Sequence, residues 1–203
     1  MTVPSAGYGR GMSRALFIID VQNDFTEGGA LGVAGGDAVA AGIGEYLARH
    51  PYDHVFASRD WHDGDNDNGG HFAAGDPDFV ESWPVHCVSG TAGAEYDPLL
   101  DTSAVDVHVR KGMGVPAYSI FDGVTDDGRT AGETLDALGV TDVDVVGIAT
   151  DYCVRASALD ALTAGRRVRV ITDLVAGVAP ESSAAALEEI AAAGGELVTS
   201  ATA

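Results

Sequence analysis

The feature that most constrains the fold of this chain is the alternation of short apolar, β-branched runs with segments of helical period. This alternation is typical of βα units that build a parallel sheet with helices on both faces. We therefore predict a single-domain α/β fold with a parallel sheet of about six strands. The predicted strands are Ala15–Ile19, Val55–Ser58, Val105–Val109, Val143–Ile148, Val168–Ile171 and Glu196–Thr199.

Two segments between these strands carry apolar side chains at a spacing that predicts one buried helix face each. Asp37 follows two glycines and is predicted to cap the first helix, whereas Gly165 and Gly194 are predicted to end later helices. Residues 61–100 and 112–130 lack periodicity, and long irregular loops in compact domains tend to carry function. The predicted helix faces are Val39, Ile43 and Leu47 in the first segment and Val154, Ala158 and Leu162 in the second.

The length and composition of the chain limit its organisation and its partners. With 203 residues, 46% of them hydrophobic, the chain can bury one core, so we expect one domain over residues 14–203. Residues 1–13 lack the apolar stretch of a secretory signal, and we expect them to form a disordered tail. The net charge of −20 disfavours nucleic acid and anionic lipid as partners. No apolar run is long enough to span a bilayer, so we expect a cytoplasmic protein with free thiols.

Polar residues follow four of the predicted strands at the points where those strands end. Asp20 ends the first strand, Asp60 follows the second, Lys111 follows the third, and Cys153 lies just past the fourth, where a helix begins. Ligands of open α/β sheets bind beyond the carboxyl ends of the strands. We therefore expect these four side chains to converge at one edge of the sheet.

Three of these residues form a candidate set for nucleophilic catalysis. Near a helix N-terminus, unpaired N–H groups and the helix dipole lower the pKa of a thiol such as Cys153 and can stabilise an oxyanion. A cysteine at this position is equally consistent with a small core residue. Asp20 could accept the thiol proton or simply cap a turn. Lys111 is the only lysine among eleven basic residues. A site that needs a compact ammonium cannot use arginine, but an arginine-biased composition explains the same count.

A second group of candidate residues lies in the aperiodic stretch after the second strand. Asp60, His62, His71 and His86 combine a carboxylate with three of the six histidines, and such ligands suit Zn, Fe, Mn or Ni. Asp60 and His62 would lie on the same side of an extended chain. The spacing matches no short zinc motif, so chance clustering of solvated histidines is the alternative. Cys87, next to His86, could be a further ligand, but it is interpreted as a buried core residue.

Five short segments contain all of these candidates except His71 and follow one another along the chain. In sequence and in order they resemble the nicotinamidase/pyrazinamidase enzymes of the isochorismatase-like cysteine hydrolases. The resemblance runs from about Ala15 to the C-terminus. The segments are Asp20–Phe25 (DVQNDF), Asp60–His62 (DWH), Trp83–Thr91 (WPVHCVSGT), Lys111–Gly112 (KG) and Gly147–Val154 (GIATDYCV).

The resemblance implies an isochorismatase-like fold and a role for each candidate residue. The implied activity is hydrolysis of nicotinamide, and of pyrazinamide, to the acid and ammonia through a thioester. The implied cofactor is one divalent metal ion, Zn, Fe or Mn. A cis peptide bond is implied between Ala149 and Thr150. The implied roles are Asp20, Lys111 and Cys153 as the catalytic triad, the Thr150 and Cys153 N–H groups as the oxyanion hole, Phe25, Trp83 and Ala149 as substrate contacts, and Asp60, His62, His71 and His86 as metal ligands.

The chain departs from this family pattern in one place that affects the predicted metal site. The spacer Asp63–Gly70 between His62 and His71 is longer than expected in close relatives, so a carboxylate of this loop could take the place of His71. The alternative functions are a metal-free isochorismatase-type or other small-amide hydrolase, and a non-catalytic metal-binding or oligomerisation module. The expected partner is a small aromatic amide, and a homo-oligomer is possible on the sequence.

Overall fold

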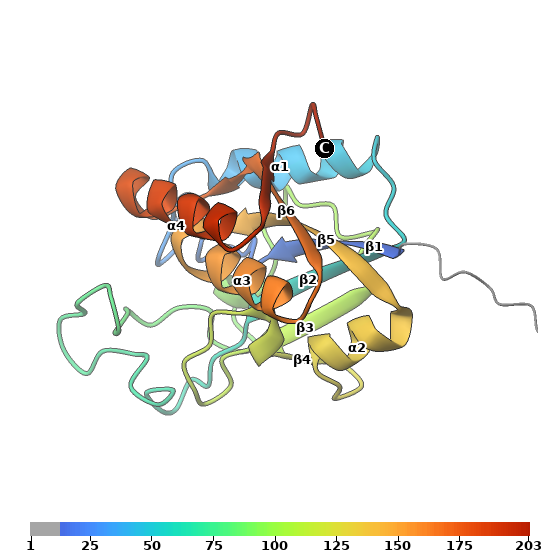
Figure 1. Cartoon of the computed structure of the whole chain (residues 1–203). Helices are drawn as coiled ribbons and strands as arrows, with labels where there is room; N and C mark the ends of the chain where they lie inside the picture. Colours follow the sequence, from blue (N-terminus) through green and yellow to red (C-terminus); the bar gives the residue numbers. More distant parts are fainter. Residues whose placement is uncertain (1–12) are drawn as a thin grey trace, which may run out of the picture.

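The computed structural model of the protein describes residues 13–203. It contains a seven-stranded sheet of order β4-β3-β2-β1-β5-β6-β7, which is parallel except at the β4 edge (Figure 1). The predicted α/β class and parallel sheet are therefore confirmed. The tail predicted for residues 1–13 lies outside the described residues except for Ser13, which begins the first strand.

The strands are connected mainly by helices, as the sequence pattern predicts. The strands are β1 Ser13–Ile19, β2 His54–Asp60, β3 Val107–Lys111, β4 Val124–Thr125, β5 Val140–Ile148, β6 Arg167–Ala176 and β7 Glu196–Val198. The α-helices are α1 Gly36–Leu47, α2 Ala131–Leu138, α3 Arg155–Thr163 and α4 Pro180–Ala192, with short helical turns η1 Ala92–Ala94, η2 Ile120–Asp122 and η3 Thr150–Val154.

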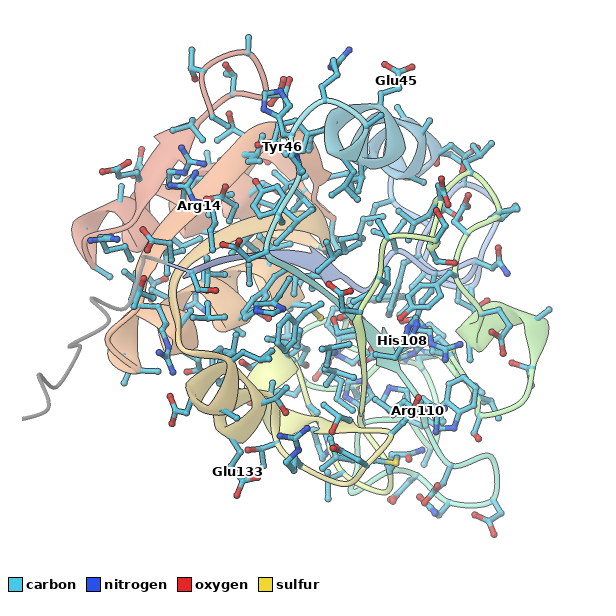
Figure 2. All side chains as sticks on the ribbon, turned by 90° about the vertical axis from the view of Figure 1, so that its right-hand side faces the viewer. Arg14, Glu45, Tyr46, His108, Arg110 and Glu133 are labelled. Atoms are coloured by element: carbon cyan, nitrogen blue, oxygen red, sulfur yellow. The ribbon has the colours of Figure 1, made fainter. Side chains whose placement is uncertain are left out.

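Strand β1 lies at the centre of the sheet and is buried on both faces. Its side chains alternate, so that Phe17 packs into the core beneath α2, α3 and α4, and Leu16 packs into the core beneath α1. The helices show the same division between inside and outside. In Figure 2, Glu45 projects outward from α1, whereas the next residue, Tyr46, is 1% exposed and packs beneath the helix. Both predicted helix faces pack against these cores, with Leu47 and Leu162 at their partly buried margins.

Several local predictions differ from the structure. The sheet has seven strands where about six were predicted, and β6 extends to Ala176 instead of ending at Ile171. Strand β3 begins two residues later than predicted and includes Lys111, which pairs with Asp60 at the end of β2. The N-cap of α1 is Gly35, not Asp37, because the Glu27 carboxylate accepts hydrogen bonds from the N–H groups of both residues at 2.6 and 2.7 Å. A distant carboxylate thus performs the capping role that was predicted for Asp37.

Gly147, near the end of β5, gives a test of how closely β1 and β5 approach. Its φ is +115°, and a Cβ there would lie 2.2 Å from the carbonyl oxygen of Ile19. Gly147→Ala combines backbone strain with overpacking, and we expect it to cost about 3 kcal/mol or more. For a chain of this size, this cost lowers the Tm by roughly 6–12 °C, measurable by circular dichroism. Gly139→Ala is the control, because Gly139 has φ +69° but open space around it; an equal loss in both variants would contradict the packing argument.

Candidate active site

The four polar residues at the strand ends converge as predicted. Asp20 directly follows β1, Asp60 and Lys111 are paired residues at the ends of β2 and β3, and Cys153 lies in η3, after β5. All four side chains are buried, and Lys111 has an exposed fraction of 0%. An ionised group is stable in such a place only when opposite charges surround it.

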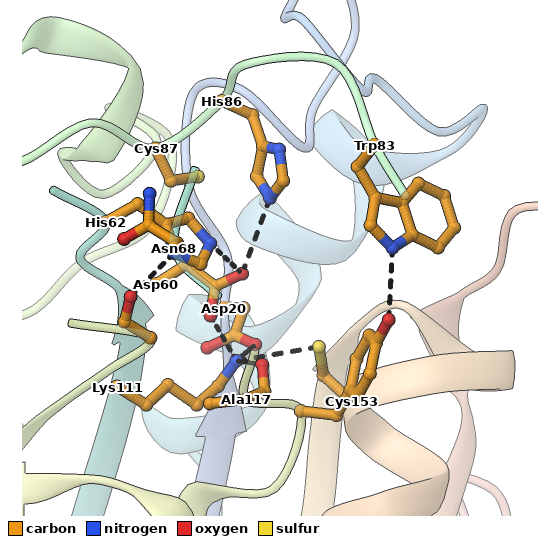
Figure 3. A network of polar contacts seen from close by, with 12 residues as sticks. Asp20, Asp60, His62, Asn68, Trp83, His86, Cys87, Lys111, Ala117 and Cys153 are labelled. Carbon is orange, nitrogen blue, oxygen red and sulfur yellow. Dashed lines mark hydrogen bonds and ion pairs between the residues drawn. The ribbon is translucent and has the colours of Figure 1, made fainter. Parts of the chain in front are cut away.

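The ammonium group of Lys111 lies at the centre of this group of residues (Figure 3). Its Nζ is 2.9 Å from Asp20 Oδ2, contacts Asp60 Oδ1, and is 3.7 Å from Cys153 Sγ. It also donates to the carbonyl oxygen of Ala117 at 3.3 Å. We call Asp20, Lys111 and Cys153 the trio.

Burial and charge shift the pKa values of the trio in a consistent direction. The position of Cys153 near a helix N-terminus predicted a lowered pKa for its thiol, but burial instead raises this pKa well above its usual value, and the Lys111 ammonium only partly opposes this effect. Burial also raises the pKa of the Asp20 carboxyl against the same ammonium. Although burial alone would lower the pKa of Lys111, the Asp20 and Asp60 carboxylates raise it above its usual value. The resting site therefore contains a thiol, a carboxylate of increased basicity and a firmly charged ammonium.

The three predicted ligand histidines also come together. Donor atoms of His62, His71 and His86, which we call the histidine cluster, all lie within 4.8 Å of one another. Asp60 adjoins the cluster, because its Oδ2 is 3.7 Å from His62 Nε2 and 3.9 Å from His86 Nε2 (Figure 3). Within the described part of the chain, this group contains His71 and no carboxylate of the spacer.

The hydrogen bonds of the histidines leave lone pairs directed into the cluster. His62 Nδ1 lies 2.8 Å from the Gly112 carbonyl and His86 Nδ1 lies 2.7 Å from the Pro84 carbonyl, so each Nδ1 carries a proton and each Nε2 is unprotonated in the neutral ring. His62 Nε2 and His71 Nδ1 are buried without a hydrogen-bond partner. Burial, with the neighbouring imidazoles, lowers the pKa of His71 to about 4. Neutral imidazoles beside a carboxylate fit a divalent metal ion.

A second set of donor atoms is equally compact but does not suit a metal ion. Atoms of Asp20, Asp60 and Cys153 also lie within 4.8 Å of one another. The Lys111 ammonium contacts both carboxylates of this set and already supplies a cation between them. Asp60 therefore separates two sites, with Lys111 against Oδ1 and the histidine cluster against Oδ2. Burial alone would raise the pKa of Asp60, but the Lys111 ammonium holds it well below its usual value.

Gln22 fixes the main chain of Asp60 and was missed by the sequence analysis. Its Oε1 accepts from the Asp60 N–H at 2.8 Å, and its Nε2 donates to the carbonyl oxygens of Asp60 and Ala94, both at 2.9 Å. The side chain is fully buried. Its position in the sequence could have indicated this role. Gln22 lies two residues after Asp20 in the DVQNDF segment, so its amide lies at the same edge of the sheet.

A cavity of about 410 Å³ lies beside these residues and joins the trio to the histidine cluster. Cys153, Asp60, His71 and His86 reach its surface. The predicted substrate contacts Phe25, Trp83 and Ala149 line it as well. Sequence analysis missed the other lining residues, which include Phe79, Tyr118, Tyr152, Val178 and residues 29–34.

Trp83 has a fixed orientation in the wall of this cavity. Its Nε1 donates to the Tyr118 hydroxyl at 3.0 Å, and its ring meets that of Tyr152 edge to face at 5.0 Å. A rigid aromatic wall of this kind suits a flat aromatic ligand.

Comparison with known proteins agrees with this geometry. Residues 14–202 match the family described as the Isochorismatase domain. The chain belongs to the isochorismatase family. This family member is 52% identical over 188 residues to the nicotinamidase/pyrazinamidase of Mycobacterium tuberculosis (strain ATCC 25618 / H37Rv), a match that covers 92% of this chain and 99% of the relative.

Two solved structures extend the family likeness to the fold. PnC1 from L. infantum, crystallised in complex with nicotinate, aligns with a TM-score of 0.81 and 34% identity over 94% of each chain. The pyrazinamidase of Pyrococcus horikoshii, crystallised in complex with zinc, aligns with a TM-score of 0.76 and 38% identity, covering 92% of this chain and 99% of that chain. The predicted isochorismatase-like fold is therefore confirmed.

One backbone prediction within this site is wrong. The cis peptide bond lies between Ile148 and Ala149, not between Ala149 and Thr150. The Ala149 carbonyl oxygen accepts hydrogen bonds from the N–H groups of Tyr152 and Val154, both at 3.1 Å. The Ala149–Thr150 peptide therefore already belongs to the start of the helix.

No helix within residues 13–203 combines the length and hydropathy needed to cross a bilayer.

Proposed function

We propose that this isochorismatase-family chain is a nicotinamidase, which hydrolyses nicotinamide, and also pyrazinamide, to the acid and ammonia. The observation that carries the proposal is one aromatic-walled cavity reached by both Cys153 and the histidine cluster. The similarity of the chain to a nicotinamidase/pyrazinamidase and to a nicotinamidase supports the same activity. The metal-free alternative would leave the buried lone pairs of the cluster without a role.

In the proposed mechanism, the trio performs nucleophilic catalysis. Asp20 accepts the proton of the Cys153 thiol, and the thiolate attacks the amide carbon. When the C–N bond breaks, Asp20 returns this proton to the leaving nitrogen, which departs as ammonia. Water then attacks the resulting thioester, again with Asp20 as base, and releases the acid and the free thiol. Lys111 keeps its charge throughout and stabilises whichever anion is present beside it.

Backbone and aromatic groups would hold the substrate for this attack. We assign the Thr150 and Cys153 N–H groups to the oxyanion, because they lie in the first turn of the helix that begins after Ala149. Phe25 and Trp83 would contact the two faces of the ring, and Ala149 would contact its edge next to the carboxamide. All three residues line the cavity beside Cys153.

Asp60, His62, His71 and His86 are the proposed ligands of one divalent metal ion, zinc, iron or manganese. When bound, the ion would supply a Lewis acid for the pyridine nitrogen and so fix the ring within the cavity. The residues themselves contribute the buried imidazole nitrogens and the Asp60 carboxylate that such an ion requires.

The proposed function is tested by incubating the purified protein, supplied with each candidate metal in turn, with nicotinamide and pyrazinamide. We expect ammonia and the corresponding acid to form in equal amounts. Isochorismate is the comparison substrate for the alternative activity. Release of pyruvate from isochorismate without ammonia from either amide would contradict the proposal.

Lys111→Arg tests whether the trio needs a compact ammonium. Arginine keeps the charge, but its planar fork cannot occupy the fully buried position that is shared by Asp20, Asp60 and the Ala117 carbonyl. We expect kcat/KM for nicotinamide to fall by about a hundredfold or more, because the trio would be displaced. Near-normal turnover by a folded Lys111→Arg protein would assign Lys111 a charge-balancing role only.

A further inference from the structure

The loop between His62 and His71 contains one residue that differs from the rest of the loop. Within Asp63–Gly70, Asn68 has an exposed fraction of 0%, whereas the remaining residues are exposed or partly exposed. This loop is the segment whose length departs from the family pattern. A buried amide in an otherwise hydrated loop requires hydrogen-bond partners, so its contacts indicate what it holds in place.

The Asn68 amide uses both its acceptor and its donor capacity. Its Oδ1 accepts from the N–H groups of Asp63 at 2.9 Å and Gly114 at 3.1 Å. Its Nδ2 donates to the carbonyl oxygens of Asp63 at 2.9 Å and Asn66 at 3.4 Å. The side chain thus closes the loop on itself and attaches it to the segment that follows β3.

These bonds connect the backbone of two predicted metal ligands. Asp63 directly follows His62, and the Asn68 carbonyl accepts from the His71 N–H at 3.4 Å. Gly114 lies two residues after Gly112, whose carbonyl fixes the His62 ring. Figure 3 shows Asn68 beside His62, away from the trio.

The backbone of Asn68 adds a second constraint. Its φ is +49°, and Gly69 and Gly70 also have positive φ, so the chain reverses here just before His71. Asparagine tolerates this left-handed conformation better than most non-glycine residues. Both the conformation and the amide therefore suit Asn68 to this turn.

We propose that Asn68 is a positioning residue for the metal site, which sets the placement of His71 relative to His62 across the lengthened loop. The proposal rests on the metal site of the proposed function. Asn68 does not contact the metal or the substrate; it acts through the backbone of the loop between the two histidines and through Gly114. The carboxylates of the same loop instead accept hydrogen bonds within the loop, as Asp63 and Asp67 do from Asn66 and Gly69.

The test is a Co²⁺ titration of chelator-treated protein, followed by its visible absorption bands. Asn68→Gly keeps the positive φ accessible and removes only the amide. We expect its affinity for Co²⁺ to fall by about 10–100-fold, with altered absorption bands, as is usual when groups that orient metal ligands are lost. Asn68→Asp keeps both accepted hydrogen bonds, so its affinity for Co²⁺ should lie between the affinities of Asn68→Gly and the wild type. Asp65→Asn is the matched control, because it changes an exposed side chain of the same loop that contacts Asn66 and not Asn68, and it should bind Co²⁺ normally.

The rate of Cys153 alkylation by iodoacetamide provides the second measurement. A residue that positions only the metal site leaves this rate unchanged in Asn68→Gly. If Asn68→Gly shows the Co²⁺ affinity and absorption bands of the wild type, the proposal is overturned. An equally large change in the alkylation rate of Cys153 would also overturn it, because it would indicate that the substitution destabilises the whole active site. Failure of the wild type itself to bind Co²⁺ would overturn the metal part of the proposed function together with this assignment. No measurement here requires turnover, so the two failures are distinguishable.

Discussion

Cys153→Ala is expected to abolish turnover of nicotinamide while the protein keeps its fold. In the proposed mechanism no other group can form the thioester, because the other cysteine in the chain, Cys87, lies outside the trio. Removing a catalytic nucleophile costs on the order of 10⁴-fold or more in kcat. Cys153 is a small side chain bordered by the cavity, so its truncation should change the thermal midpoint only slightly. Ammonia release and a thermal melt measure the two effects.

Cys87→Ala is the matched control for this variant. Cys87 is fully buried, and its thiol lies 3.8 Å from the Gly93 carbonyl instead of facing Lys111. Its pKa is also raised by burial, so a test of thiol titration alone would not separate the two cysteines. We expect Cys87→Ala to retain the wild-type kcat. Substantial turnover of nicotinamide by Cys153→Ala would contradict the role of Cys153 as the nucleophile. Loss of turnover in Cys87→Ala alone would contradict it as well.

Benzamide is expected to be a much poorer substrate than nicotinamide. Both amides present the same carboxamide and would fit between the proposed substrate contacts Phe25 and Trp83, but benzamide lacks the ring nitrogen that the proposed metal ion would bind. Loss of this anchor removes affinity and also the orientation of the carboxamide toward Cys153. Because misplacement by about 1 Å can cost on the order of a hundredfold, we expect kcat/KM to be at least about a hundredfold lower for benzamide.

His62→Ala should remove most of this difference by lowering the turnover of nicotinamide. The control is His108→Ala, since His108 lies on β3 and its Nδ1 is 3.0 Å from the Tyr96 hydroxyl, outside the histidine cluster. This variant should keep the full preference for nicotinamide. Equal turnover of the two amides by metal-loaded wild-type protein would favour the metal-free amidase mechanism.

The convergence of the trio and Asp60 could be predicted from the sequence because parallel strands end at one edge of the sheet. Asp20, Asp60, Lys111 and Cys153 each follow or end a strand, so their convergence follows from topology alone. The placement of His71 could not be predicted in this way. It depends on the fold of an aperiodic loop, in which one buried amide makes contacts that no periodic pattern encodes.

Other elements were missed for physical reasons that differ from one to the next. Strand β4 has only two residues, too few for any alternation to be visible, and it pairs antiparallel at the sheet edge. Helix α2 did carry a signal, since Thr130 and Glu133 form a capping box. The cavity wall brings Phe79, Tyr118 and Tyr152 together from three separate segments, and only tertiary packing determines that they meet.

Partitioning of the acyl group between water and hydroxylamine tests the central claim most directly, namely that the amide is hydrolysed through a thioester on Cys153. The account predicts that added hydroxylamine diverts the product from nicotinate to nicotinohydroxamate without slowing ammonia release, and that acid-quenched protein carries one nicotinoyl group on Cys153. Steady formation of ammonia and nicotinate with neither hydroxamate nor a nicotinoyl-bearing protein would contradict it.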